Sequence, residues 1–108
     1  MQTTATSKRQ LSIPRQQLIE VMQRFAFCDI RHLPIVRGEP VLAGLQVVHE
    51  LKLGADNDPR IQLHLKDFIL KKCQVELMEI LDSVGDGVLE SVEVKFGLPY
   101  RVRVTRSL

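Results

Sequence analysis

The chain has 108 residues, of which 15 are Lys or Arg and 13 are Asp or Glu, so its formal net charge is +2. This length suits a single domain, and the hydrophobic fraction of 44% is sufficient for a core that needs no disulfide or metal. The small net charge argues against a polyanion-binding tail and does not by itself indicate a nucleic-acid partner.

The sequence indicates a soluble protein of the cytoplasm. Cys28 and Cys73 are far apart and form no C-x-x-C pair, which favours two reduced thiols. The first ten residues lack the apolar segment of a secretory signal, and no apolar run approaches the roughly 18 residues that a membrane span requires. We therefore expect a disordered polar tail over residues 1–9, a single domain over residues 10–108, and no association with membranes.

The first half of the chain predicts an amphipathic helix between two short strands. Residues 10–14 alternate in polarity, which predicts an edge strand that ends at proline. Residues 15–27 have the spacing of a helix, residues 31–36 read as a strand, and residues 37–40 have the composition of a turn. The apolar stripe of the helix consists of Leu18, Val21, Met22 and Phe25.

Residues 41–53 admit three interpretations. Apolar side chains share one face if the segment is a strand, and form a stripe if it is a helix that ends at Gly54. The third interpretation, which we favour, is a strand to about Gln46 followed by a short helix.

The second half predicts a strand and a second helix. Residues 55–59 are a loop by composition, and residues 61–65 alternate as in a half-buried strand. Asp67 is the expected N-cap of a helix that runs to about Ser83. The expected buried side of this helix consists of Leu70, Cys73, Leu77, Ile80 and Val84.

Residues 89–106 predict an antiparallel β-hairpin. A three-residue loop at 97–99 gathers the apolar side chains on one face and sets Glu93 opposite Arg103. This register predicts the pairs Phe96–Tyr100, Val94–Val102 and Val92–Val104 on the inner face. The outer face carries Lys95, Arg101 and Arg103, which predict either a solvated surface or a contact with an anion, nucleic acid or partner.

Together these elements predict an α+β fold in which two main helices pack on a mostly antiparallel sheet, in the order β-α-β-β-α-β-α-β-β. The order of elements in residues 61–106 repeats that of residues 10–53 without the last helix. The chain therefore suggests a tandem of two similar units.

Signals for catalysis or metal binding are missing from the sequence. No H-x-x-x-H, H-E-x-x-H or cysteine pair supplies metal-ligand spacing, so no metal is predicted. The chain has no nucleophile-elbow pattern, and Glu76 and Glu79 read as part of a solvated helix face rather than an acid–base pair. The sequence therefore favours a non-enzymatic protein.

One phrase resembles a known module. Residues 31–36, Arg-His-Leu-Pro-Ile-Val, are followed by a turn and by Leu-Ala-Gly-Leu-Gln at 42–46, and residues 10–53 thereby resemble a single cystathionine-β-synthase-type (CBS) domain. The resemblance implies a β-α-β-β-α unit and adenine nucleotides bound between paired repeats. It assigns the ligand site to Gly44, Val47 and Glu50. Val47 stands where the family has a Ser or Thr hydroxyl, and Glu50 replaces the family's Asp.

Two functions follow as expectations. The first is a CBS-like regulatory module, forming a homodimer, that senses adenine nucleotides or contacts another protein. The alternative is a small nucleic-acid- or partner-binding protein that uses the basic hairpin face. A protein whose site belongs to no familiar class is a third interpretation that the sequence leaves open.

Overall fold

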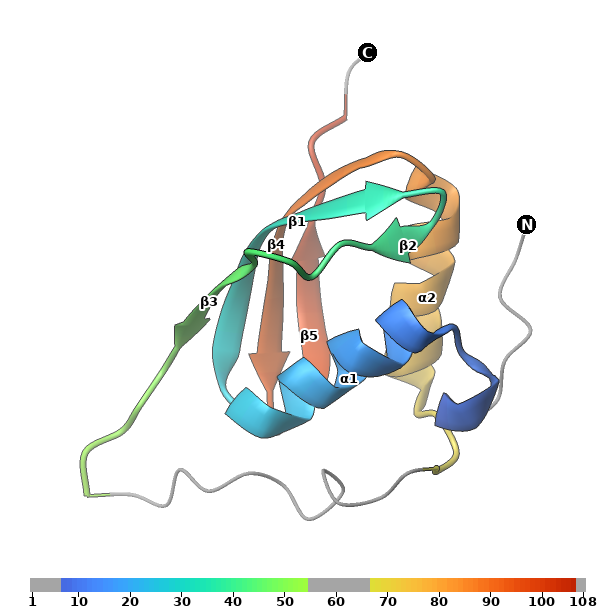
Figure 1. Cartoon of the computed structure of the whole chain (residues 1–108). Helices are drawn as coiled ribbons and strands as arrows, with labels where there is room; N and C mark the ends of the chain where they lie inside the picture. Colours follow the sequence, from blue (N-terminus) through green and yellow to red (C-terminus); the bar gives the residue numbers. More distant parts are fainter. Residues whose placement is uncertain (1–6, 55–66, 107–108) are drawn as a thin grey trace.

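The computed structural model describes residues 7–54 and 67–106. Figure 1 shows two helices, α1 and α2, packed against a curled sheet of five antiparallel strands. The α+β class predicted from the sequence is confirmed, with the last two strands at the C-terminal end. In chain order the elements are a 3-10 turn η1 (Lys8–Gln10), α1 (Ile13–Phe25), β1 (Cys28–Val36), β2 (Glu39–Pro40), β3 (Gln46–His49), α2 (Lys72–Val84), β4 (Gly87–Lys95) and β5 (Leu98–Arg103).

The sheet is centred on the antiparallel pair β1–β4. Its strand order is β2-β1-β4-β5, and β3 pairs with a different part of β1. Cross-strand pairs such as Ile30–Val92 and Leu33–Leu89 are buried, and opposite residues of an antiparallel pair share a face. These side chains form one core with the helices, whose fully buried apolar residues are Leu18, Ile19, Met22, Leu77, Met78 and Leu81.

The edge strand predicted over residues 10–14 is wrong, because α1 begins within that segment. The Ser12 hydroxyl accepts a hydrogen bond from the Arg15 N–H at 3.4 Å, and Pro14 lies in the first turn of the helix. Serine as N-cap and proline in the first turn are strong helix-start signals. These helix-start signals outweigh the strand-like alternation of polarity over residues 10–14.

The polar tail predicted over residues 1–9 does not extend to Lys8, which is only 2% exposed. The N–H of Lys8 donates to the carbonyl of Phe68 at 2.9 Å, and its Nζ lies 3.2 Å from the Glu20 carboxylate. The aliphatic stem of a lysine can pack in this way while its charge stays paired. Residues 1–6 lie outside the described residues.

The strand–helix split favoured for residues 41–53 is also wrong. Residues 46–49 form β3, and no helix is present among residues 41–54. A turn at Gly44, where φ is +72°, separates β3 from the short strand β2. The adjacent valines 47 and 48 have side chains that favour extended backbone, and β1 offers them an open edge for pairing.

Helix α2 begins at Lys72, later than predicted. Asp67 does not cap it, and instead its carboxylate accepts a hydrogen bond from the Arg9 N–H at 2.9 Å. The buried stripe is rotated relative to the prediction and consists of Gln74, Leu77, Met78 and Leu81, while Cys73, Ile80 and Val84 are half-buried. The loop and the strand predicted over residues 55–59 and 61–65 lie outside the described residues.

The C-terminal hairpin has a different register from the predicted one. Lys95 pairs with Leu98, so the loop consists of the two residues Phe96 and Gly97 rather than of residues 97–99. Both loop residues have positive φ, 55° and 75°. This conformation is typical of a type I′ turn, whose twist matches that of the two strands.

A β-bulge follows the turn. Val94 pairs with Pro99, but Glu93 pairs with Arg101, so Tyr100 is an extra residue on β5. The predicted pairs Phe96–Tyr100, Val94–Val102, Val92–Val104 and Glu93–Arg103 therefore do not form. Of the predicted inner face, Val92 and Val94 are buried and Val102 and Val104 are half-buried, whereas Phe96 and Tyr100 are exposed.

The two halves of the chain repeat one helix–strand–strand unit. Helices α1 and α2 both have 13 residues, β1 and β4 both have 9, and corresponding bounds differ by 59 positions (13 to 72, 25 to 84, 28 to 87, 36 to 95). The N–H of Gly38 donates to the Gly85 carbonyl at 2.7 Å, and its counterpart Gly97 donates to Ala26 at 2.9 Å. Residues 12–40 thus correspond to residues 71–99, a narrower match than the tandem expected from the sequence.

Candidate functional site

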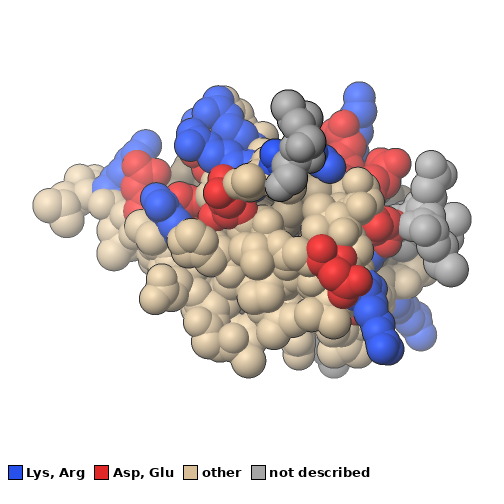
Figure 2. All heavy atoms as spheres, turned by 90° about the horizontal axis from the view of Figure 1, so that it is seen from above, with Lys and Arg blue, Asp and Glu red and all other residues tan. Residues whose placement is uncertain are grey.

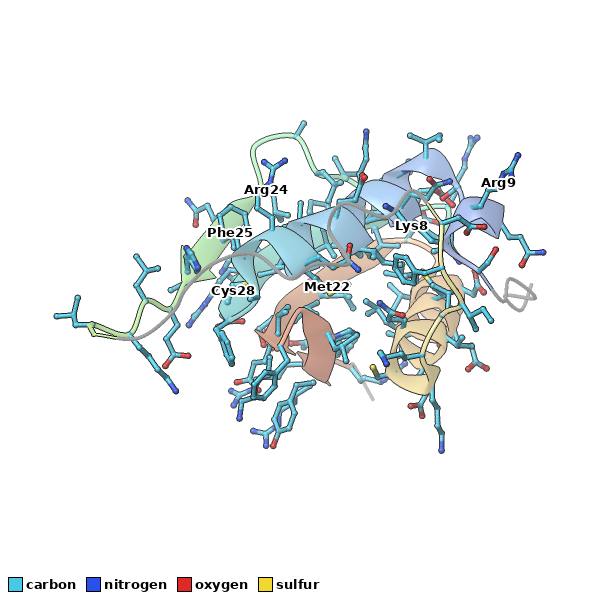
Figure 3. All side chains as sticks on the ribbon, turned by 90° about the horizontal axis from the view of Figure 1, so that it is seen from below. Lys8, Arg9, Met22, Arg24, Phe25 and Cys28 are labelled. Atoms are coloured by element: carbon cyan, nitrogen blue, oxygen red, sulfur yellow. The ribbon has the colours of Figure 1, made fainter. Side chains whose placement is uncertain are left out.

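Aromatic and basic side chains form two contact groups beside the turn of the β4–β5 hairpin. The first consists of Phe27, Lys52 and Phe96, the second of Lys95, Tyr100 and Arg101, and we call the two together the tip patch. The two-residue turn exposes Phe96, and the bulge exposes Tyr100, by 61% and 56% respectively. In Figure 3, seen from below, Phe25 and Cys28 lie at the end of α1 where the chain turns back into β1, and Lys8 and Arg9 lie at the opposite end.

Tyr100 is bordered by two cations. The Nζ of Lys95 lies 4.2 Å from the centre of its ring, and the Cζ of Arg101 lies 5.4 Å from it. Arg101 also pairs with Glu93, with 3.5 Å between Nε and Oε2. Exposed cation–π contacts contribute about 0.5–1 kcal/mol each, enough to favour one orientation of the ring.

A second pair of rings extends the tip patch towards β1. Phe27 and Phe96 meet edge to face, with ring centres 4.9 Å apart and planes at 68°. The Nζ of Lys52 lies 5.7 Å from the centre of the Phe27 ring. Three aromatic rings and three cations from separate parts of the chain are thereby brought to one end of the molecule.

Of this patch, the sequence located only Lys95 and Arg101. Lys95, Arg101 and Arg103 are exposed, as expected, but Glu93 lies opposite Arg101 and not Arg103. The aromatic residues were missed because the predicted register assigned them to the core. The dipeptide Phe96-Gly97 was the available signal, since glycine in the second position is typical of a two-residue hairpin turn.

The CBS resemblance assigned a ligand site to three residues that lie in or beside β3, between residues 44 and 50. Gly44 is an exposed turn residue, Val47 is half-buried opposite Ile30, and Glu50 is exposed. The N–H of Glu50 donates to the Phe27 carbonyl at 2.9 Å. These residues line neither of the two cavities described below, and nucleotide binding by them stays a prediction.

A cavity of about 250 Å³ lies between the two helices and the hairpin turn. Its walls are formed by Gln23, Phe68, Lys71, Gln74, Phe96, Gly97 and Leu98. Gln23 and Gln74 are only 3% and 1% exposed, and among the described residues no donor reaches Oε1 of Gln23. A buried acceptor without a donor costs about 1–3 kcal/mol, so this oxygen is a feature to be explained.

A shallower cavity of about 230 Å³ lies between α2 and β5. Its walls include the half-buried Cys73 and the pair Tyr100 and Arg101 of the tip patch. The other cysteine, Cys28, is buried, and burial first and the charge of Asp29 second raise the pKa of its thiol from 9.0 to about 12. Cys28 is therefore a neutral thiol at pH 7 and not a nucleophile.

Among residues 7–54 and 67–106, no group of three or more His, Cys, Asp or Glu side chains is arranged to hold a metal ion. Neither helix of this part of the chain is long and apolar enough to cross a membrane. A scan against models of protein families, a search of curated proteins and a search of solved structures each gave no match.

Proposed function

We propose that this chain is a binding protein whose tip patch contacts single-stranded nucleic acid. The observation that carries the proposal is Tyr100, which is 56% exposed while Lys95 and Arg101 border its ring. Single-strand binders combine rings on which bases stack with cations that follow the phosphates. The tip patch supplies both at one end of the molecule.

Single strands suit this surface better than a duplex. Stacking on Phe96 and Tyr100 requires bases whose faces are free, which a duplex does not offer. Base–aromatic stacking contributes about 1–3 kcal/mol per base, independently of sequence. We therefore expect binding with little sequence preference and with a dissociation constant on the order of 1–100 μM at physiological salt.

The charges of the tip patch, together with Arg103 of β5, should act mainly on the phosphates. Lys52, Lys95, Arg101 and Arg103 can contribute three or four phosphate contacts, although Glu93 offsets part of the charge of Arg101. For a single strand, that number lowers log K by about 2–3 for each tenfold rise in salt. The small net charge of the whole chain is compatible with this, since three of its 15 Lys and Arg residues lie in the tip patch.

Fluorescence anisotropy with a labelled twelve-residue oligothymidine tests the proposal. The double substitution Arg101→Glu/Arg103→Glu should weaken binding at least tenfold and flatten the salt dependence. The matched control, Arg9→Glu/Arg37→Glu, makes the same change of charge on two exposed residues, of which Arg9 lies at the opposite end of α1 (Figure 3) and Arg37 lies beside Asp86, and should change binding less than threefold. An equal loss of affinity in the two variants would mean that the oligothymidine is attracted only by the total charge of the protein. That result would contradict a binding site at the tip.

The homodimer expected from the sequence stays a prediction, and the surface indicates where to test it. Figure 2 shows a broad area without charged side chains on one side of the view from above. Exposed apolar residues near the turn of β1 into β2 include Val36 and Val88, at 51% and 47%. Sedimentation of the wild type and of Val88→Glu would show whether a dimer exists and whether Val88 lies in its interface.

A further inference from the structure

The repeat brings equivalent positions of the two halves to equivalent places, but the side chains there differ in kind. In the first half, Arg15 of α1 donates from Nη2 to the Gly38 carbonyl at 2.9 Å and to the Asp82 carboxylate at 2.5 Å. Glu39 adds a second carboxylate 3.6 Å from Nε. One planar guanidinium thus fills the space between α1, α2 and the β1–β2 turn.

The counterparts of these residues line the cavity of about 250 Å³. Counting 59 positions along the chain, Gln74 corresponds to Arg15, Gln23 to Asp82, and Gly97 to Gly38. All three lie in the cavity wall. The shorter side chain of Gln74 does not extend as far as that of an arginine, so the space that a guanidinium occupies in the first half is left open in the second.

Oε1 of Gln23, which has no donor within residues 7–54 and 67–106, occupies the position that corresponds to the Asp82 carboxylate of the first half. In the first half the Asp82 carboxylate accepts the arginine, and in the second half Oε1 of Gln23 has no donor among the described residues. Gln74 does not supply one, because its Oε1 accepts from the Lys71 N–H at 2.8 Å and its Nε2 does not reach Oε1 of Gln23. The cavity wall therefore contains a side-chain acceptor without a donor in the described part of the chain, and the cavity lacks the planar donor that its counterpart in the first half contains.

We infer that this cavity is a binding site for a small, flat, uncharged ring compound that carries an NH2 donor. The NH2 group donates to Oε1 of Gln23, and the ring lies among Phe68, Phe96 and Leu98. Burial of an apolar ring with a few fixed polar contacts is the usual composition of a small-molecule site. The inference goes beyond the proposed nucleic-acid contact and does not depend on it.

The charges around the cavity favour a neutral donor over a cation. Arg15 is balanced by Asp82 and Glu39, whereas the corresponding residues of the second half, Gln23 and Leu98, are uncharged. Lys71 in the cavity wall adds a positive charge. A cation in the cavity would lack a counter-ion, and a neutral carboxamide or ring-bound amine would not.

Three probes of nearly equal size separate these requirements. Benzamide is a neutral ring with an NH2 donor, benzamidine is its cationic analogue, and acetophenone has no N–H. In two-dimensional amide NMR of the full chain, benzamide should give saturable shifts at Gly97 and at the side-chain amides of Gln23 and Gln74. Benzamidine should bind at least fivefold more weakly, and acetophenone should cause no saturable shift. Equal binding of acetophenone, or tighter binding of benzamidine, would overturn the inference.

Two variants test the same site from the protein's side. Gln23→Leu removes the acceptor and should abolish benzamide binding, while oligothymidine binding at the tip patch persists. Gln23→Asp/Gln74→Arg rebuilds the ion pair of the first half and should close the cavity to all three probes. Full benzamide binding by either folded variant would contradict the site. If the wild type bound benzamide but not oligothymidine, the proposed nucleic-acid contact would be contradicted and the cavity site would not.

Discussion

The guanidinium of Arg15 lies 2.5 Å from the carboxylate of Asp82, and this ion pair joins α1 to α2. The two side chains are 9% and 18% exposed, so water screens them little. The same guanidinium donates to the backbone of Gly38 in the β1–β2 turn. One side chain thus connects both helices and one edge of the sheet.

Removing one partner of this buried pair should be costly. We expect Asp82→Ala to lower the free energy of unfolding by about 3 kcal/mol, because the charge of Arg15 stays buried with less compensation. The control is Asp29→Ala, which breaks the pair of Asp29 with the 52% exposed Arg31 and should cost about 1 kcal/mol or less. Urea denaturation followed by circular dichroism measures both, and equal losses would contradict the structural role given to Arg15.

Gly38 and Gly44 have similar backbone conformations but different surroundings. Their φ angles are +76° and +72°, so alanine is strained at both positions by about 1 kcal/mol. A Cβ at Gly38 would lie 3.2 Å from Nη2 of Arg15, whereas at Gly44 nothing lies within 4 Å. Gly38→Ala should therefore destabilise the fold by about 1–2 kcal/mol more than Gly44→Ala does in thermal denaturation. The opposite ranking would mean that the Arg15 contact is not close in solution.

Cys28 makes stability depend on pH in the alkaline range. Its pKa is raised from 9.0 to about 12 in the folded state, so the folded thiol holds its proton where the unfolded thiol loses it. The stabilising contribution is complete below pH 9 and is lost as the pH rises towards 12, at up to about 1.4 kcal/mol per pH unit. Cys28→Val should flatten the fall in unfolding free energy between pH 9 and pH 10.5. An unchanged slope would show that other groups cause it.

The two thiols should differ in reactivity at pH 8. Cys73 is half-buried at the edge of the cavity between α2 and β5, while Cys28 is 6% exposed and neutral. We expect one rapid modification by a small alkylating reagent, located at Cys73 by peptide mass spectrometry, and a second only after denaturation. Rapid modification of Cys28 in the native protein would contradict its burial.

Local patterns in the sequence were sufficient for the elements with clear periodicity. The apolar spacing in residues 15–27 and 70–84 predicted both helices within a few residues. In the observed stripe of α2, however, Gln74, Met78 and Leu81 take the place of three expected residues that are half-buried. The strand predicted over residues 31–36 is present, but β1 already begins at Cys28, because β3 and β4 pair with residues 28–31. Those pairing partners lie far away in the sequence, so no local pattern indicates them.

The alternation of polar and apolar residues in the sequence could not predict either candidate site. Alternation alone assigned Phe96 and Tyr100 to the core, whereas the conformation of Gly97 and the bulge at Tyr100 expose both. Gln23 and Gln74 looked like ordinary polar residues of two helices. Their importance appears only when the tertiary repeat places them opposite each other, at the counterparts of Asp82 and Arg15.

The central claim is that the exposed ring of Tyr100 stacks on nucleic-acid bases between its two cations. Anisotropy of the labelled oligothymidine with Tyr100→Ala and Tyr100→Phe tests this most directly, because both variants remove the hydroxyl but only the first removes the ring. We predict that Tyr100→Phe binds within about twofold of the wild type and that Tyr100→Ala weakens binding by about tenfold or more, as loss of one stacked base requires. Undiminished binding by Tyr100→Ala, in a protein with wild-type thermal stability, would contradict the account.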